Sequence, residues 1–190
     1  MAQDKFVTFI TPTVGRDTLQ RACDSVDAQH NDGWYHYVIG DGLLPNVTPT
    51  SQRSIIEAPH WRHEAKVRNF GIQMTGTPWV AFLDDDDTVD ETYVQILSEE
   101  IEDTPEVEVI IFRQTIPTEM QHFGDKVIPS TPEILWGNTG ISYACTTAIA
   151  MAHPFKRSKH EDLLQLTAFE AAGAKIKFSD HILYYGRDHR

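Results

Sequence analysis

The chain has 190 residues, of which 41% are hydrophobic and 23% are charged, and its formal net charge is −12. This composition is ordinary for a globular protein and is sufficient for one domain with a sizeable core. The acidic charge argues against nonspecific nucleic-acid binding, which requires a basic surface. No apolar run is long enough to span a membrane. The two cysteines, Cys23 and Cys145, have no paired spacing, so we expect them to be reduced and the protein to be cytoplasmic.

The first part of the chain is predicted to alternate between strands and helices. Beyond Asp17, apolar residues recur at the i, i+3, i+4, i+7 spacing of an amphipathic helix. These apolar residues are Leu19, Ala22, Cys23 and Val26. Further helices are expected at 64–74 and 90–101. The expected strands are 5–11, 34–39, 54–57, 79–83 and 107–113.

The second part of the chain has a less regular pattern. Residues 115–140 contain several prolines and glycines and are predicted to be a long loop region, whose length suggests a functional role. The remaining expected elements are a strand at 141–150, a helix at 161–172 and short strands at 175–178 and 182–185. This order predicts an α/β fold with one mostly parallel sheet flanked by helices and a small mixed or antiparallel C-terminal part.

Four consecutive aspartates, Asp84 to Asp87, are the most informative residues of the chain. They directly follow the apolar run Trp79–Leu83, which is typical of a buried strand. Adjacent carboxylates repel one another, and a divalent cation relieves the repulsion because hard cations prefer oxygen ligands. Ligands of open α/β sheets bind at the carboxyl ends of strands. The alternative interpretation is a solvated acidic turn before a helix, whose first turn favours acidic residues.

Two other expected strands also end in polar residues. Thr11-Pro12-Thr13 follow the first strand, and Asp41 follows the second between two glycines. Because the carboxyl ends of parallel strands share one edge of a sheet, these residues could converge with Asp84–Asp87 on one ligand. Asp41 could then accept hydrogen bonds from a ribose or a base, although Gly-Asp-Gly is equally well explained as a turn.

Three further charged sites each have a functional and a structural interpretation. Arg68 has several basic residues just upstream and could meet a diphosphate, or it could lie on a solvated helix face. Glu161-Asp162 could supply a general base, or they could stabilise the N-terminus of a helix. His189 could ligate a metal, or it could be a polar chain end without a role.

Together these motifs resemble those of family 2 glycosyltransferases, which have the GT-A fold. The resemblance extends from about Lys5 to His189 and is specific because five segments occur in order. These segments are Val7–Thr13, Val38–Gly42, Arg68–Ile72 with Gly76, Trp79–Asp87, and Glu161–Leu163 with Gly173. Two positions depart from the family pattern: Val14-Gly15 stand where Tyr-Asn is common, and Asp85 stands where the family has a small or variable residue.

The resemblance implies transfer of a sugar from a nucleotide-sugar donor, with UDP favoured by family habit, to a hydroxyl of a glycan or other acceptor. Asp162 would be the catalytic base of an inverting reaction. Metal ligands would be Asp86, Asp87 and His189, with Mn²⁺ or Mg²⁺ as the cofactor. The residues implied in nucleotide-sugar binding are Thr11, Pro12, Thr13, Asp41, Arg68, Asp84, Asp85 and Asp86. No Gln-x-x-Arg-Trp motif follows, so a single addition is favoured over a processive synthase.

The resemblance also implies how the chain is organised. We expect one GT-A domain over 1–190, with a nucleotide-binding half at about 1–114 and an acceptor-side half at about 115–190. Acceptor contacts are expected in 115–140, including Trp136. The chain could also be one domain of a longer protein that holds the acceptor.

Three rival functions remain open at this point. Asp84 and Asp86, with Thr88, also match the opening motif of haloacid-dehalogenase-type phosphatases, in which the first aspartate is a nucleophile. That interpretation leaves the first 80 residues unexplained. A calcium loop starting at Asp84 would require Gly and Glu where Val89 and Gln95 stand. The third rival is a domain that binds a nucleotide sugar but transfers nothing.

Overall fold

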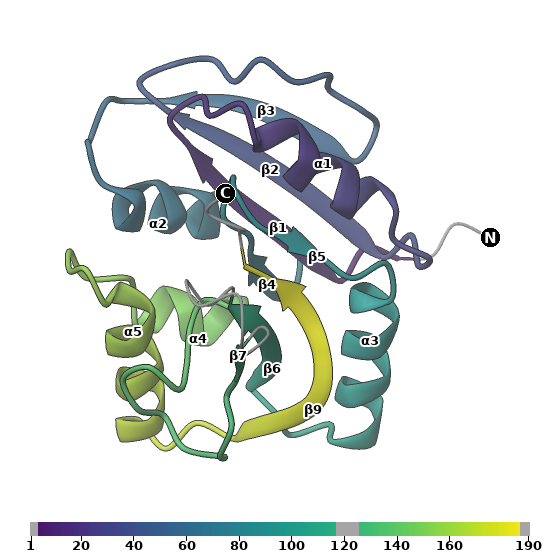
Figure 1. Ribbon diagram of the computed structural model, residues 1–190, viewed down its shortest axis with the longest axis vertical. Coiled ribbons are helices and arrows are strands. Elements are labelled where there is room, and N and C mark those ends of the chain that lie inside the picture. Colours follow the sequence, from purple (N-terminus) through teal and green to yellow (C-terminus); the bar gives the residue numbers. More distant parts are fainter. Residues whose placement is uncertain (1–3, 117–125, 187–190) are drawn as a thin grey trace.

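A computed structural model describes residues 4–116 and 126–186 and shows one nine-stranded sheet flanked by helices (Figure 1). The strand order is β3-β2-β1-β4-β8-β6-β9-β5, and β7 pairs with β6. The strands are β1 (Val7–Thr13), β2 (Trp34–Asp41), β3 (Arg53–Ala58), β4 (Trp79–Phe82), β5 (Thr88–Val89), β6 (Val109–Ile116), β7 (Lys126–Ile128), β8 (Tyr143–Thr146) and β9 (Ile176–Tyr185). The helices are α1 (Leu19–Asp27), α2 (Glu64–Met74), α3 (Tyr93–Asp103), α4 (Thr147–Ala152) and α5 (Glu161–Ala171).

The parallel part of the sheet contains β3, β2, β1 and β4. Strand β1 is buried along its whole length and pairs in parallel with both β2 and β4. Thr13 at the end of β1 lies beside Gly40 of β2, so the two strands end at the same level. Parallel strands bury both faces, which explains the continuous apolar runs of this region. The predicted convergence of these strand ends at one edge is therefore confirmed.

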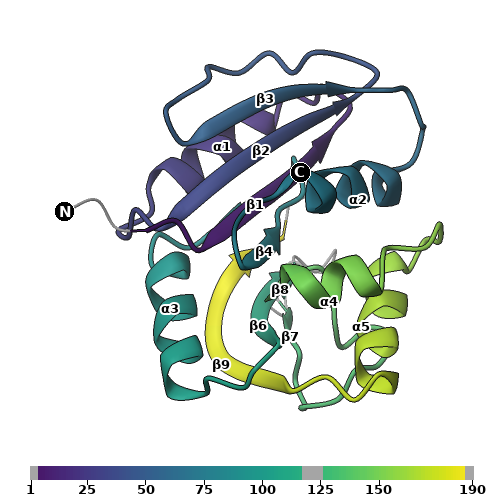
Figure 2. The same ribbon diagram turned by 180° about the vertical axis from the view of Figure 1, so that it is seen from behind.

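The C-terminal part of the sheet has mixed pairing. Strand β8 is antiparallel to β4 and β6, whereas β9 is parallel to β6 and antiparallel to β5. Figures 1 and 2 show β9 as a long curved strand, with α3 on one side of the molecule and α5 on the other. Helix α2 lies above α5 in both views. The predicted α/β class with a small mixed C-terminal part is confirmed.

Several expected elements have different bounds. The strand expected at 141–150 ends at Thr146, where helix α4 begins. The Thr146 hydroxyl accepts the N–H of Ile149 and caps the helix, and the alanines that follow favour helix over strand. The two short strands expected near the C-terminus are one continuous strand, β9. Strands β5 and β7 were not predicted because two and three residues show no periodicity.

Helix α2 approaches the sheet closely because Gly71 has no side chain. A Cβ atom at this position would lie 2.7 Å from Cγ2 of Ile10 and 2.9 Å from Cδ1 of Ile39. Both isoleucines are buried in β1 and β2, so the helix axis could not keep its place with a larger residue. The same helix carries Arg68, which this close packing brings to the strand ends.

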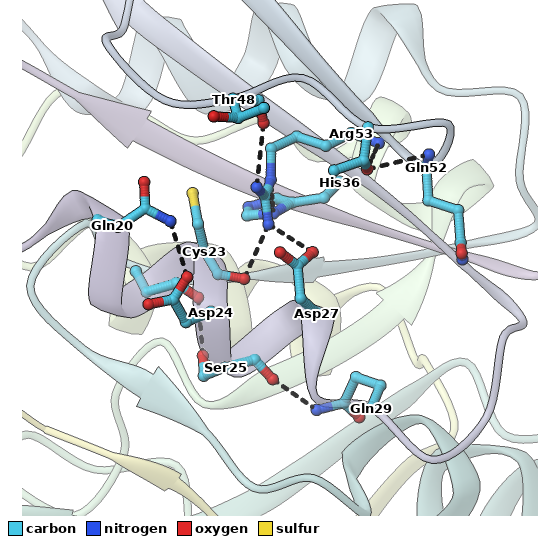
Figure 3. A network of polar contacts seen from close by, with 12 residues as sticks. Gln20, Cys23, Asp24, Ser25, Asp27, Gln29, His36, Thr48, Gln52 and Arg53 are labelled. Atoms are coloured by element: carbon cyan, nitrogen blue, oxygen red, sulfur yellow. Dashed lines mark hydrogen bonds and ion pairs between the residues drawn. The ribbon is translucent and has the colours of Figure 1, made fainter.

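Arg53 on β3 is a buried side chain that ties the sheet to α1 (Figure 3). Its guanidinium donates to Asp27 at 2.6 Å, to the carbonyl of Cys23 at 2.8 Å and to the carbonyl of Thr48 at 3.3 Å. Its Nε donates to Nδ1 of His36 at 3.4 Å. Cys23 and Cys145 are buried free thiols, and the cytoplasmic location stays a prediction.

His36 is expected to make the stability of the fold sensitive to acid. Burial and the nearby Arg53 lower the pKa of His36 from 6.5 to about 3. In the unfolded chain His36 therefore binds a proton near pH 6.5, whereas in the folded chain it binds one only near pH 3. The contribution of His36 to stability falls as the pH drops between these values. We expect His36 to contribute a loss of about 2 kcal/mol to the free energy of unfolding between pH 6.5 and 4.5, whereas the raised pKa of Glu161 contributes in the opposite direction.

This loss is measurable by urea unfolding at several pH values. The His36→Gln variant keeps a hydrogen-bonding side chain but cannot titrate, so its stability should fall by about 2 kcal/mol less than that of the wild type over the same range. His181→Gln, at an exposed position, is the matched control and should follow the wild type. Parallel pH profiles for the wild type and His36→Gln would contradict the assignment.

Candidate active site

A cleft of about 540 Å³ lies over the carboxyl ends of the parallel strands. Its lining combines residues after β1, β2 and β4 with residues at the start of α2. The lining residues are Pro12, Thr13, Val14, Arg16, Asp41, His60, Arg62, His63, Glu64, Val67, Arg68, Asp84, Asp85 and Asp86. Acidic and basic side chains therefore face one another across a cavity large enough for a small ligand.

Asp85 is the structural member of the aspartate run. Its side chain is 3% exposed, accepts a hydrogen bond from the Thr13 hydroxyl at 2.6 Å and pairs with Arg16 at 2.8 Å. Burial raises the pKa of Asp85, and Thr13 and Arg16 oppose that shift. Arg16 also pairs with Asp86 at 2.8 Å. The guanidinium thus partly neutralises two adjacent carboxylates and fixes the turn after β4.

The other three aspartates form a cluster suited to a metal ion. One carboxylate oxygen from each of Asp84, Asp86 and Asp87 lies within 4.8 Å of the others. Tyr184 on β9 holds this arrangement, because its hydroxyl donates to Asp87 at 2.8 Å and accepts the backbone N–H of Asp84 at 3.1 Å. Three hard oxygen donors fit Mg²⁺ or Mn²⁺, which take carboxylate ligands together with oxygens of a phosphate.

Arg68 links the aspartate run to the start of α5. Its guanidinium is buried, donates to Asp84 and Glu161, and packs against the ring of Phe155 at 5.4 Å. Burial raises the pKa of Glu161, and Arg68 opposes the shift. Nδ1 of His63 lies 3.6 Å from the second Glu161 oxygen and accepts the N–H of Ala65 at 3.2 Å. Glu161 is therefore a structural partner of Arg68.

Asp162 lines a second cavity, of about 240 Å³, together with Asp84 and Asp87. Its Oδ1 accepts the N–H of Leu163 at 2.8 Å, and within residues 4–116 and 126–186 its Oδ2 makes no hydrogen bond. Burial raises the pKa of Asp162, while the Leu163 amide and Arg68 lower it. A half-buried carboxylate with one uncommitted oxygen can accept a proton from a ligand in this cavity.

The structure brings most of the predicted site residues together, with four qualifications. Asp85 was expected to bind the nucleotide sugar, but its carboxylate is already held by Thr13 and Arg16. Thr11 does not reach the cleft, because it is fully buried and its hydroxyl lies 2.9 Å from Nε2 of His36. Asp41 lines the cleft, but its carboxylate already accepts the N–H groups of Trp61 at 2.5 Å and His63 at 3.1 Å. His189 lies outside the described residues, so its metal role stays a prediction.

Arg16, Tyr184 and the Arg68–Glu161 pair were not predicted. Arg16 stands in a turn and Tyr184 in the last strand, and nothing in the local sequence points from either residue to the aspartates. Only the parallel order of β1 and β4 and the pairing of β9 with β5 bring them near. Tyr184 could have been suspected because a tyrosine that is buried near the end of a strand needs a partner for its hydroxyl.

A sequence profile described as "Glycosyl transferase family 2" matches residues 8–155. No curated protein matches the sequence. Among solved structures, S. aureus TarS 1-349 in complex with UDP aligns with a TM-score of 0.74 at 16% identity, covering 96% of this chain and 60% of that chain. The same TarS fragment in complex with UDP-GlcNAc gives a TM-score of 0.72 at 16% identity, covering 98% of this chain and 59% of that chain.

These alignments show the fold, which is the GT-A-like fold predicted from the sequence. The chain spans about three fifths of the TarS fragment, and a longer TarS structure is covered over 37% of its length at 15% identity. No helix among the described residues is both long and apolar enough to cross a membrane.

Proposed function

The chain belongs to glycosyl transferase family 2, and from this premise we propose that it transfers a sugar from a nucleotide-sugar donor to an acceptor hydroxyl. The observation that carries the proposal is the position of Asp162. This carboxylate lines the same cavity as Asp84 and Asp87. Asp84 and Arg68 line both this cavity and the larger cleft, so the two adjoin. A metal cluster on the donor side and a base on the acceptor side are the two parts that the reaction needs.

The larger cleft is the proposed donor site. Its volume suits a nucleoside diphosphate, and Pro12, Thr13 and Asp41 line the part near β1 and β2. The complexes of TarS with UDP and UDP-GlcNAc support a UDP-sugar as the donor. Arg62 and His63 line the same cleft and could meet the negative charge of the diphosphate. Thr11 would act indirectly, by fixing the end of β1 through His36.

Asp84, Asp86 and Asp87 would hold Mn²⁺ or Mg²⁺. A bound divalent ion supplies positive charge that stabilises the diphosphate leaving group. Tyr184 keeps Asp87 oriented for this role, and Arg16 keeps Asp86 and Asp85 in place. Residues of the chain thus pre-organise the cluster before the donor arrives.

Asp162 would accept the proton of the acceptor hydroxyl as the oxygen attacks the anomeric carbon. Attack from the face opposite the nucleotide inverts that carbon, as the bond from the carbon to the diphosphate oxygen breaks and the nucleoside diphosphate leaves. Single addition is favoured because no Gln-x-x-Arg-Trp motif follows. Glu161 lines the same cavity but is the less suitable base, because Arg68 pairs with its carboxylate and stabilises it in the ionised form. A pKa raised by burial makes Asp162 a stronger base than an exposed aspartate.

The metal role is tested by donor binding. We expect Mn²⁺ to increase the affinity for UDP, and Asp87→Asn to reduce this metal-dependent increase tenfold or more, because it removes one charged ligand. Titration of UDP with and without Mn²⁺ measures both effects, and release of free sugar from UDP-GlcNAc distinguishes a transferase from an idle binding domain. Asp103→Asn, at an exposed end of α3, is the control. An unchanged Mn²⁺ effect in Asp87→Asn would refute the assignment.

The phosphatase alternative is not supported by the surroundings of Asp84. The proposed nucleophile would be Asp84, which Arg68 already holds in an ion pair. Family membership also accounts for the first 80 residues, which a phosphatase motif leaves unexplained. A separate assay of phosphate release distinguishes the two functions, because a phosphatase would release phosphate from a generic ester without a nucleotide sugar.

A further inference from the structure

The cavity beside Asp162 contains a buried polar group that the described protein leaves unsatisfied. Gln114 on β6 lines this cavity and is 8% exposed, and its Oε1 has no hydrogen-bond partner among the described residues. A Cβ at Gly140 would lie 2.7 Å from Nε2 of Gln114, so this glycine leaves space for the amide. Buried carbonyl oxygens are nearly always hydrogen-bonded, which points to a ligand that donates a hydrogen bond here.

A short basic segment, 156–160, borders the same cavity. Both of its neighbours are fixed on Arg68: Phe155 packs against the guanidinium, and Glu161 accepts a hydrogen bond from it. Lys159 lines the cavity. The segment also carries Lys156 and Arg157, and all three cations are exposed. None of the three forms an ion pair with any residue that the structure describes, although the chain has 28 acidic and only 16 basic side chains.

An exposed aromatic ring lies beside this segment. Trp136 is 74% exposed, and its ring stands nearly perpendicular to that of His160, with the centroids 6.2 Å apart. Leu135 and Leu164 are also exposed, at 53% and 43%. An exposed indole offers a flat surface on which a polar ring can stack while its hydroxyls stay in water.

We propose that this cavity is the acceptor subsite and that the acceptor is a sugar carrying a phosphate or carboxylate group. The inference rests on the proposed transferase function and specifies its acceptor class. Asp84, Asp87 and Asp162 make the interior acidic, so an anion is excluded there and a hydroxyl is admitted. The anionic group stays at the rim, where Lys159 lies, and Lys156 and Arg157 belong to the same exposed segment.

The parts of the subsite have separate roles. Gln114 accepts a hydrogen bond from one acceptor hydroxyl and thereby orients the neighbouring hydroxyl toward Asp162. The cations of segment 156–160 bind the charged group, and Trp136 covers the ring. Gln114 and the cations are positioning residues, since neither takes part in the proton transfer.

The test is a calorimetric titration of the protein loaded with Mn²⁺ and UDP. The probes are glucose, glucose 6-phosphate, glucuronate and inorganic phosphate. We expect at least one of the two anionic sugars to bind about tenfold more tightly than both glucose and inorganic phosphate. Comparison of glucose 6-phosphate with glucuronate identifies which anionic group is preferred. The variant Lys156→Gln/Lys159→Gln should reduce this preference to less than threefold. The control, Lys5→Gln/Lys175→Gln, removes the same charge elsewhere and should preserve it.

Gln114→Leu provides an independent measurement. It should weaken binding of all three sugars several-fold and leave UDP affinity unchanged. Equal binding of glucose and the anionic sugars, including no binding by any of them, would overturn the proposal, as would a preference that survives in the double lysine variant. Affinity for UDP and release of sugar from UDP-GlcNAc, measured on the same samples, show separately whether the proposed transferase function itself holds.

Discussion

Replacing Arg68 with alanine is expected to destabilise the fold by roughly 3–5 kcal/mol and to reduce sugar transfer about a hundredfold. Arg68 is 4% exposed and lies between the carboxylates of Asp84 and Glu161. Its loss leaves Glu161 buried without a counter-charge, and removal of one partner of a buried ion pair costs about this much. Activity falls as well, because Asp84 loses the contact that orients it next to Asp87.

Urea unfolding and an assay of UDP release measure the two effects of Arg68→Ala. Arg113→Ala is the matched control, because Arg113 pairs with Asp180 at 2.6 Å on the surface, where the two side chains are 38% and 91% exposed. An exposed pair contributes at most about 1 kcal/mol, so this variant should be nearly as stable as the wild type. Equal stability losses in the two variants would show that Arg68 is not the central ion pair of the site.

Replacing Asp162 with asparagine is expected to reduce transfer by about 10²–10⁴-fold without weakening donor binding. The substitution preserves size and the hydrogen bond from the Leu163 amide but removes the ability to accept a proton. UDP affinity depends on the other cavity and should stay unchanged. Rates of sugar transfer to an acceptor that the wild type uses, and titrations with UDP, are measured on the wild type and on Asp162→Asn.

The pH profile gives a second readout for Asp162. The base acts only when ionised, and burial raises its pKa, so transfer by the wild type should decline as the pH falls through this raised pKa. The residual activity of Asp162→Asn should lack that decline. Asp180→Asn, at an exposed position, should behave like the wild type. Full activity of Asp162→Asn would show that a residue other than Asp162 acts as the base.

The parts of the site that could be predicted from the sequence are those that follow directly on apolar strands. Asp84–Asp87 and Asp41 are recognisable because a polar group after a buried run must lie at the edge of a sheet. Gly71 was recognised only as part of a motif, and the structure gives its physical reason, which is the close approach of α2 to Ile10 and Ile39. Local pattern and global fold agree at these positions.

The parts that could not be predicted depend on contacts between residues far apart in the chain. Arg16 meets Asp85 and Tyr184 meets Asp87 only because of the strand order, which periodicity does not reveal. Helix α4 was missed for a different reason. Its apolar residues directly continue the apolar run of β8, so periodicity does not show where the strand ends, and the Thr146 cap that marks the boundary is a single side-chain hydrogen bond.

Strand β9 has a consequence for the order of events during synthesis. Tyr184, which orients Asp84 and Asp87, is on the last strand of the sheet, and β9 joins β6 in parallel by pairing Val109 with Ile176. Such distant parallel pairings form slowly, because a long stretch of chain must be ordered first. A nascent chain therefore carries all four aspartates long before it can arrange them. Until β9 arrives, one edge of β6 stays open to pairing with other chains, so the ten-residue strand β9 both orients the aspartate cluster and covers the edge of β6.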